Sequence, residues 1–284
     1  MEQNILRMLI CEEQVSLTLA NTTELVKEAQ RIHGLKRGMA SVLGKFLSIA
    51  AYMSAALKEE SGEISFALQT DGACGQINVS GNHSLHIRGY AEGASAEGTE
   101  TELLGENGSF TVIRDDGYSR PFVGSCAIPE QATVEGIVEE YYRISEQLPT
   151  YIGAVVDFDE KGEVSYAGMA VLQPLPFTSE STIAALPKGE ALRAIVQKMQ
   201  GMELEEVAIC EFSAKKDGIK GKKATYTCNC SRAYLLQVLT SLGEEQMREI
   251  IREDGAVRVH CHYCNTDYSF DDRDADLIFK RKKQ

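Results

Sequence analysis

Hydrophobic and polar positions in the first sixty residues follow patterns that predict a strand and two helices. Residues 15–20 alternate between apolar and polar side chains, which is typical of a half-buried strand. Residues 24–33 predict a helix that ends at Gly34. Apolar side chains recur at helical spacing through residues 37–58, so we expect this helix to form the buried centre of the domain.

The middle of the chain predicts an antiparallel sheet. Residues 63–113 contain short alternating segments separated by glycine and asparagine turns. A helix is expected at residues 133–147, closed by Pro149, and residues 151–172 predict a hairpin. Together these elements indicate an α+β core at residues 1–177, in which helices pack on an antiparallel sheet.

A proline-rich stretch after the hairpin marks a boundary near Phe177 and begins a helical linker, expected at residues 178–226. Residues 188–200 predict its clearest element, an amphipathic helix. Its apolar face contains what we call the latch residues: Leu192, Ile195, Val196 and Met199. Nothing in the linker is apolar enough to fold alone. We therefore expect this face to cover another surface, most simply the core sheet.

The last part of the chain, residues 227–284, predicts a small separate domain. Two helices are expected at residues 232–242 and 244–252, broken at Gly243, and a short strand at residues 256–260. Elements of this size have little apolar area to bury, so we expect a metal to stabilise them.

The composition is that of a soluble globular protein, with 43% hydrophobic and 25% charged residues. Acidic residues precede any apolar run long enough for a signal peptide, and the longest apolar stretch, residues 38–57, is interrupted by Lys45. We therefore expect no membrane partner. Eight cysteines without a secretory signal indicate a reducing compartment, which we take to be the cytoplasm.

The net charge of −13 lies entirely in residues 1–177, where 12 Lys and Arg face 25 Asp and Glu. The remaining residues hold 17 of each sign. An acidic body repels phosphate backbones, which argues against a nucleic-acid partner. Basic clusters are expected to be solvated loops and tails; they comprise Lys215, Lys216, Lys220, Lys222 and Lys223, and residues 280–283.

Two tight cysteine pairs are the most informative chemical feature of the sequence. Cys228 and Cys230 form a C-x-C pair, and a thirty-residue interval separates them from the C-x-x-C pair of Cys261 and Cys264. Four thiolates at such spacing suit a closed tetrahedral Zn²⁺ site, with no position left for a catalytic water. Because adjacent thiols released from metal can oxidise to each other, the site is either structural or a redox switch.

Other potential ligands and nucleophiles are less informative. His260 or His262 could complete a Cys₃His site, but four cysteines are available and thiolate is the softer ligand. The remaining cysteines are far apart in sequence and receive no role: Cys11, Cys74, Cys126 and Cys210. The sequence has no G-x-x-x-x-G-K-[ST] loop for binding ATP phosphates.

Four segments resemble the 33 kDa chaperonin family of redox-regulated heat-shock holdases. They are residues 227–271 with both cysteine pairs, YYRISEQLPT at 141–150, AGMAVLQPLP at 167–176 and HIRGYAE at 86–92. The resemblance covers essentially the whole chain. No departure from the family's C-x-C…C-x-x-C pattern removes a ligand.

This resemblance implies a chaperone, not an enzyme, that holds unfolding client proteins without ATP. The reduced protein is then latent and carries one Zn²⁺ per chain on the four paired cysteines. Oxidation forms the disulfides Cys228–Cys230 and Cys261–Cys264, releases the zinc and detaches the linker. The core is expected to bind clients and to dimerise, so that the active protein is a homodimer.

An enzyme is the main alternative: a thiol-disulfide oxidoreductase using Cys261 and Cys264. Against it, this pair follows a predicted strand, whereas a thioredoxin-type pair opens a helix that lowers the thiol pKa. A zinc-ribbon nucleic-acid binder is a further alternative, which the acidic body disfavours.

Overall fold

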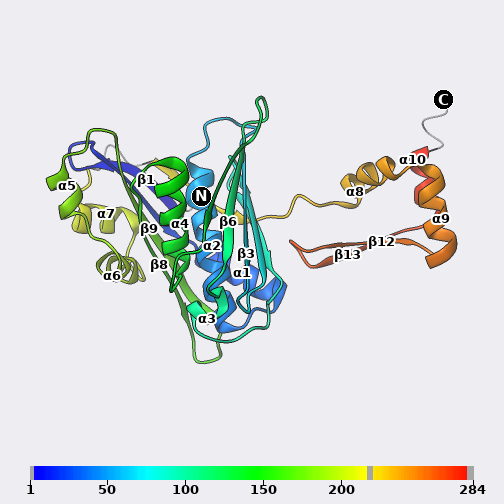
Figure 1. Ribbon diagram of the computed structural model, residues 1–284, viewed down its shortest axis with the longest axis horizontal. Helices are drawn as coiled ribbons and strands as arrows, with labels where there is room; N and C mark the ends of the chain where they lie inside the picture. Colours follow the sequence, from blue (N-terminus) through cyan, green and yellow to red (C-terminus); the bar gives the residue numbers. More distant parts are fainter. Residues whose placement is uncertain (1–2, 216–219, 280–284) are drawn as a thin grey trace. The chain divides into compact units, whose positions relative to one another are not determined.

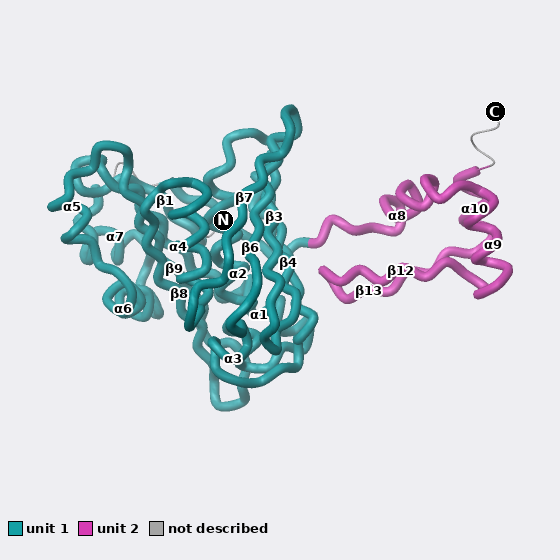
Figure 2. The backbone as a smooth tube through the Cα atoms, in the orientation of Figure 1, with its two compact units in different colours: residues 1–227 teal, residues 228–284 magenta. Residues whose placement is uncertain are grey.

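The structure is a computed structural model that describes residues 3–215 and 220–279. It divides into two compact units, residues 1–227 and 228–284 (Figure 2). The predicted linker belongs to the first unit, and a functional boundary at residue 177 stays a prediction. Lys216 and the basic tail at residues 280–283 lie outside the described residues.

Two sheets form the frame of the first unit (Figure 1). The five-stranded sheet has the order β10-β1-β2-β9-β8, with β1 (Ile5–Ile10), β2 (Val15–Asn21), β8 (Tyr151–Phe158), β9 (Val164–Pro174) and β10 (Lys220–Lys222). The six-stranded sheet has the order β11-β5-β4-β3-β6-β7, with β3 (Glu63–Thr70), β4 (Gln76–Asn82), β5 (His86–Ala91), β6 (Gly108–Asp115), β7 (Phe122–Ala127) and β11 (Thr225–Tyr226). The predicted antiparallel pairing is confirmed, apart from the parallel pair of β11 and β5.

Helix α2 (Arg37–Ala55) packs against strands of both sheets and is the buried centre that its periodicity predicts. Fifteen of its 19 residues are buried, so it has no solvent-exposed stripe. Its Phe46 ring packs 5.7 Å from that of Phe66 and 5.8 Å from that of Phe110. By length and composition alone α2 could also cross a membrane, but 89% of its apolar window is buried inside the fold, as in a core helix.

The other core helices follow the predictions with two differences. Helix α1 (Thr23–His33) ends at Gly34, which adopts the left-handed conformation with φ 59°. A short helix α3 (Glu100–Leu104), held by a capping box of Thr99 and Glu102, was not predicted. The helix expected at residues 133–147 is α4 (Val134–Tyr141) followed by a π-helical turn, η1 (Tyr142–Glu146). Glu146 accepts a hydrogen bond from the Tyr141 hydroxyl at 2.7 Å, which supports this wider turn.

The linker is helical, as predicted, with α5 (Glu180–Ala185), α6 (Glu190–Lys198) and α7 (Leu204–Phe212). Helix α6 packs on β8 and β9, and α7 packs on β1 and β2. Successive side chains of a strand point to opposite faces of the sheet, and in this sheet they belong alternately to two apolar clusters. One cluster contains the side chains of α2, and the other contains those of α6 and α7. The linker helices therefore cover the face of the five-stranded sheet that points away from α2. The apolar face of the linker therefore covers the core sheet.

The chain between the linker and the second unit joins both sheets, and we call residues 220–226 the strap. Its first strand, β10, pairs with β1, and its second, β11, pairs with β5. The side chain of Asn4 accepts a hydrogen bond from Ala224 N at 2.7 Å and donates one to Ala224 O at 3.0 Å. The Tyr226 hydroxyl donates to Gly89 O at 2.8 Å.

The second unit contains the expected helices on either side of Gly243: α8 (Arg232–Leu239) with a 3₁₀ turn η3 (Thr240–Leu242), and α9 (Glu244–Asp254). They are followed by the hairpin of β12 (Val257–Cys261) and β13 (Thr266–Phe270), and by α10 (Asp272–Phe279). The core of this unit is small: Leu236, Leu239, Met247, Ile251, Val257, Phe270, Ala275 and Phe279. The guanidinium of Arg232 lies 4.6 Å from the centre of the Phe270 ring and pairs with Asp274 at 2.6 Å.

Candidate metal centre and docked linker helix

Four cysteine side chains meet in the second unit. Cys228 and Cys230 directly precede α8, which begins where the Ser231 hydroxyl accepts a hydrogen bond from Tyr234 N at 3.1 Å. Cys261 is the last residue of β12, and Cys264 lies in the turn that leads to β13. A helix start and a hairpin turn thus bring the two distant pairs together.

The sulfur atoms form one compact group, with all four Sγ atoms within 4.8 Å of one another. The Sγ atoms of Cys228 and Cys261 are 3.7 Å apart, and those of Cys230 and Cys264 are 3.2 Å apart. All four are free thiols. A tetrahedral Zn²⁺ with Zn–S bonds of about 2.3 Å places its sulfurs about 3.8 Å apart. The predicted ligand set is therefore assembled in a form that fits one metal ion.

Burial and mutual hydrogen bonding perturb these thiols. Burial raises the pKa of Cys230, and contacts with the other thiols raise it further against a hydrogen bond with the Tyr268 hydroxyl at 3.3 Å. Burial also raises the pKa of Cys261. Burial acts in the same direction on Cys264, but hydrogen bonds from Thr266 and from its thiol neighbours outweigh it and lower the pKa. Because metals bind thiolates, a metal taken up here displaces protons.

The histidines beside Cys261 are not part of this group within the described residues. His260 Nδ1 lies 2.8 Å from a carboxylate oxygen of Asp267, and the rings of His260 and His262 pack edge to face. The C-x-x-C pair spans the end of a strand and a hairpin turn, so no helix N-terminus is positioned to stabilise a thiolate at Cys261. This geometry differs from that of a thioredoxin-type pair.

The four other cysteines divide into two kinds. Cys74 and Cys126 are buried, and burial raises the pKa of each thiol to about 11. Such thiols are almost entirely protonated at neutral pH and so react slowly. Cys11 and Cys210 are exposed.

The latch residues of α6 all face the five-stranded sheet. Leu192, Val196 and Met199 are at most 1% exposed, and Ile195 is 9% exposed. Gly153 of β8 allows this approach, because a Cβ there would lie 2.9 Å from Leu192 Cγ. The hydroxyl of Tyr166 on β9 donates a hydrogen bond to Val196 O at 2.8 Å. The helix is thus docked by apolar packing and by one buried backbone contact.

A buried group of charges, which the sequence did not predict, also ties α6 to the core. Arg193 Nε lies 3.3 Å from one carboxylate oxygen of Glu135, and Lys45 Nζ lies 3.1 Å from the other. Lys45 also pairs with Glu100 at 2.7 Å. Nearby, Glu139 accepts a hydrogen bond from Ile152 N at 2.7 Å. Lys45, Glu100 and Arg193 come from α2, α3 and α6, and only Glu135 and Glu139 share a helix, α4, so no local sequence pattern relates the whole group.

Comparison with known proteins decides the family. The profile of the family described as Hsp33 protein matches residues 3–271. The chain belongs to the Hsp33 family. A relative from Acetivibrio thermocellus named 33 kDa chaperonin is 32% identical over an alignment of 296 positions, which spans 99% of this chain and 98% of the relative. Another of that name, from Alkaliphilus oremlandii, is 28% identical and covers 96% of this chain and 94% of the relative.

A solved structure supports the fold of this Hsp33 family member. The crystal structure of the 33 kDa chaperonin (heat shock protein 33 homolog) from Thermotoga maritima matches with a TM-score of 0.82 over 100% of this chain and 99% of that chain, at 24% identity. The predicted family and the α+β fold class are confirmed. As a family member the protein is a chaperone; the relatives named above are called 33 kDa chaperonin, and neither their name nor that of the family indicates an enzyme.

Proposed function

We propose that this protein is a redox-regulated, ATP-independent holdase that is latent when reduced and zinc-bound. The single observation that carries the proposal is the compact group of four free thiols in a unit with a very small apolar core. A site of this kind links the redox state of the cysteines to the folding of the unit that contains them.

In the reduced protein, Cys228, Cys230, Cys261 and Cys264 bind one zinc ion per chain. Bound zinc contributes on the order of 10 to 16 kcal/mol of apparent folding free energy in small domains. The thiolates hold the hairpin turn against the start of α8. Eight buried side chains complete the fold of this unit.

Oxidation joins Cys228 to Cys230 and Cys261 to Cys264. Each pair of thiolates loses two electrons and forms one S–S bond, while one hydrogen peroxide takes up these electrons and two protons from solvent to give two waters, and the metal ion is released to solvent. In the reduced group, sulfur contacts run between the pairs, at 3.7 Å for Cys228 and Cys261 and at 3.2 Å for Cys230 and Cys264. The two sulfurs of each pair are also within 4.8 Å of each other, and oxidation of one pair removes two of the four ligands, so that the metal is released and the two segments separate.

The new disulfides stabilise the unit far less than the metal does. Loops of three and four residues restrict the unfolded chain by only about 1.6 and 1.9 kcal/mol. The segment between the two pairs is then no longer held at both ends. The second unit unfolds. The strap, and through it the linker, is then connected to an unfolded segment of chain and no longer to a folded unit.

The linker helix then leaves the sheet and exposes apolar surface on both. On α6 this surface consists of the latch residues, each of which contributes about 1.5 to 3 kcal/mol when fully buried. Unfolding client proteins bind these surfaces and are held without ATP. Loss of the metal shifts a population between two states, because only the latent state binds it.

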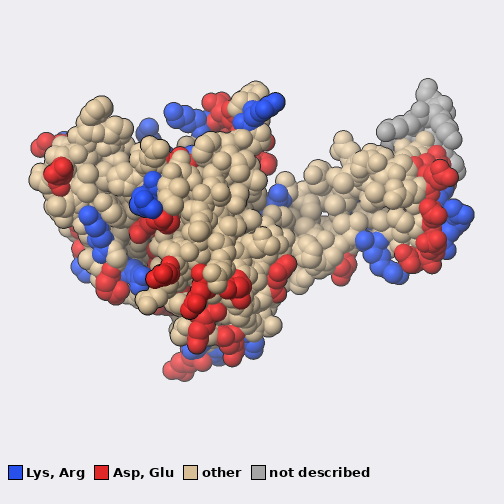
Figure 3. Space-filling model, viewed as in Figure 1, with Lys and Arg blue, Asp and Glu red and all other residues tan. Residues whose placement is uncertain are grey.

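The partners and location follow from the same reasoning. Free thiols need a reducing compartment, and we place the protein in the cytoplasm. Acidic side chains gather on the first unit near α3 (Figure 3), a surface that repels nucleic acids and anionic membranes. Unfolded proteins are therefore the partners, and the active form is a homodimer, as the family resemblance implies.

The test measures zinc content, free thiols and suppression of client aggregation before and after peroxide. We expect one zinc per chain in the reduced protein, and loss of zinc together with four thiols as the activity appears. Cys264→Ser should abolish tight zinc binding, whereas the matched Cys210→Ser should not. A reduced protein without zinc, or activity that appears with zinc retained, contradicts the proposal.

Two further measurements test the disulfide pairing and the oxidoreductase alternative. Peptide mapping that finds mainly links between the two pairs contradicts the proposed disulfides but not the switch. Rapid reduction of insulin by the protein would instead favour the oxidoreductase.

A further inference from the structure

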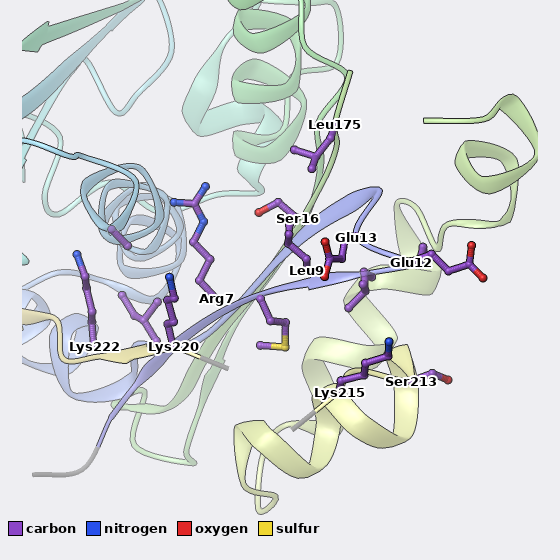
Figure 4. A pocket seen from close by; sticks show the side chains of 15 residues that line it. Arg7, Leu9, Glu12, Glu13, Ser16, Leu175, Ser213, Lys215, Lys220 and Lys222 are labelled. Atoms are coloured by element: carbon purple, nitrogen blue, oxygen red, sulfur yellow. The ribbon is translucent and has the colours of Figure 1, made fainter. Parts of the chain in front are cut away.

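A cavity of about 670 Å³ opens beside β1 at the edge of the five-stranded sheet (Figure 4). Its volume is within the range of small-molecule sites, about 300 to 1,000 Å³. Part of the lining is apolar and includes Leu9, Ala55 and Leu175. Four cations also line it: Arg7, Lys215, Lys220 and Lys222. The cavity lining thus combines apolar side chains with positive charge.

Three of these cations share one face because of the strand register. Arg7 lies directly opposite Lys220 in the β1–β10 pair, and Ile5 lies opposite Lys222. Opposed residues, and residues two apart on a strand, project from the same face of a sheet. Figure 4 shows the side chains of Arg7, Lys220 and Lys222 extending to the same side of this ribbon.

These three cations have no acidic partner among the residues that the structure describes, although the chain carries a net charge of −13. The carboxylates in the lining, Glu12 and Glu13, belong to the β1–β2 turn, on the side of Lys215 (Figure 4). Like charges directly opposite each other on neighbouring strands destabilise the pairing. The short strand β10 is therefore held to β1 against a repulsion that a bound anion would remove.

We propose that this cavity binds an amphipathic organic anion. Arg7, Lys220 and Lys222 hold its carboxylate or phosphate head group, and its apolar tail lies on Leu9, Ala55 and Leu175. Charge-assisted hydrogen bonds of this kind are the strong ones in proteins, and Arg with Lys suits either head group.

The proposed ligand connects two parts of the chain. Arg7 belongs to the core and the two lysines belong to the strap, so only the docked strap offers the complete site. A ligand that binds one state alone stabilises that state. The ligand therefore holds β10 on β1 and favours the latent protein; this last consequence rests on the proposed function, whereas the binding itself does not.

The test uses the reduced, zinc-loaded full chain with dodecanoate below its micelle concentration, measured by calorimetry. We expect saturable binding of one dodecanoate per chain, about tenfold or more weaker in the double variant Lys220→Gln, Lys222→Gln. The control is Lys223→Gln, which removes one positive charge from an exposed neighbour outside the cavity lining and should bind like the parent. Acetate, which has no tail, and dodecyl maltoside, which has no charge, should not saturate the site.

Hydrogen exchange gives a second readout that does not involve chaperone activity. Dodecanoate should slow exchange of the β10 amides in the parent and in Lys223→Gln, but not in the double variant. Equal binding of dodecyl maltoside, or equal affinity in the double variant, overturns the proposal. So does binding only to phosphatidylglycerol vesicles without uptake of free dodecanoate, which would indicate a membrane surface and not a cavity ligand.

Discussion

Glu139 shows how a single side chain makes the stability of the core depend on pH. Burial raises the pKa of its carboxyl group, and the charge of Glu135 adds to this, against a hydrogen bond from Ile152 and the charge of Arg193. A raised pKa means that folding favours the protonated carboxyl. This contribution to stability is fully present below the pKa of the unfolded chain and is lost as pH rises through the higher pKa of the folded protein.

We predict that Glu139→Gln raises the stability of the first unit at neutral pH. Glutamine keeps an oxygen that accepts the hydrogen bond of Ile152 but carries no charge. The urea midpoints of parent and variant should move apart, in favour of the variant, as pH rises from about 5 to 8. Glu140→Gln is the control with the opposite sign, since a hydrogen bond from Arg143 lowers the pKa of Glu140. A difference for Glu139→Gln that shrinks with rising pH would contradict this account.

Individual residues also show what the sequence could and could not predict about the site. The grouping of the four cysteines was predictable because each pair is a short motif whose chemistry is local. The charge group around Glu135 was not, because Lys45 and Arg193 join it from α2 and α6, far away in sequence. A lysine within an apolar helix was the only local sign of a buried ion pair.

At the scale of elements, the docking of α6 is what the latch proposal depends on. We predict that Ile195→Asp weakens docking, since burial of such a side chain contributes about 1.5 to 3 kcal/mol. The reduced variant should suppress client aggregation without oxidation and keep its zinc. Ala194→Asp, at an exposed position of the same helix, should behave like the parent. An Ile195→Asp variant that is folded, zinc-loaded and inactive would show that docking does not keep the protein latent.

The ion pair between α6 and the core supports a separate prediction. Arg193→Gln leaves Glu135 with Lys45 alone, and the Arg193 side chain is 36% exposed, so the loss should be well below the about 3 to 5 kcal/mol of a fully buried pair. We expect a variant that stays latent but is activated at a lower peroxide dose. Arg143→Gln breaks an exposed pair within one helix and should leave the dose unchanged. Equal doses for both variants would refute a role for the buried pair.

Elements with a clear period were predictable, and those without one were not. The helical spacing of apolar residues in α2 and α6 predicted both their conformation and their burial. Strands β10 and β11 have three and two residues and no apolar pattern. They are strands only because β1 and β5, some two hundred and one hundred and forty residues earlier, present edges to them.

At the scale of the whole molecule, the two units should respond differently to loss of metal. We predict that a strong chelator removes hydrogen-exchange protection from α8 and α9 while β2 and β9 keep theirs. The physical reason is that the first unit has large apolar clusters on both sides of the five-stranded sheet, whereas the second has eight buried side chains. Cys264→Ser without chelator should give the same pattern. Loss of protection in both units at once would mean that they fold as one.

The strap should delay activation of the proposed switch. It lies in sequence between Cys228 and the linker helices, and it is hydrogen-bonded to both sheets. If unfolding starts at the cysteines and proceeds along the chain, Tyr226 must first separate from β5. Residues 220–222 must then separate from β1 before unfolding reaches α7 and α6. A brief oxidant pulse, followed by reduction, can end while the strap is still in place. Transient oxidation would then leave the protein latent. Clients would be bound only when oxidation lasts longer than the time that the strap needs to separate from both sheets.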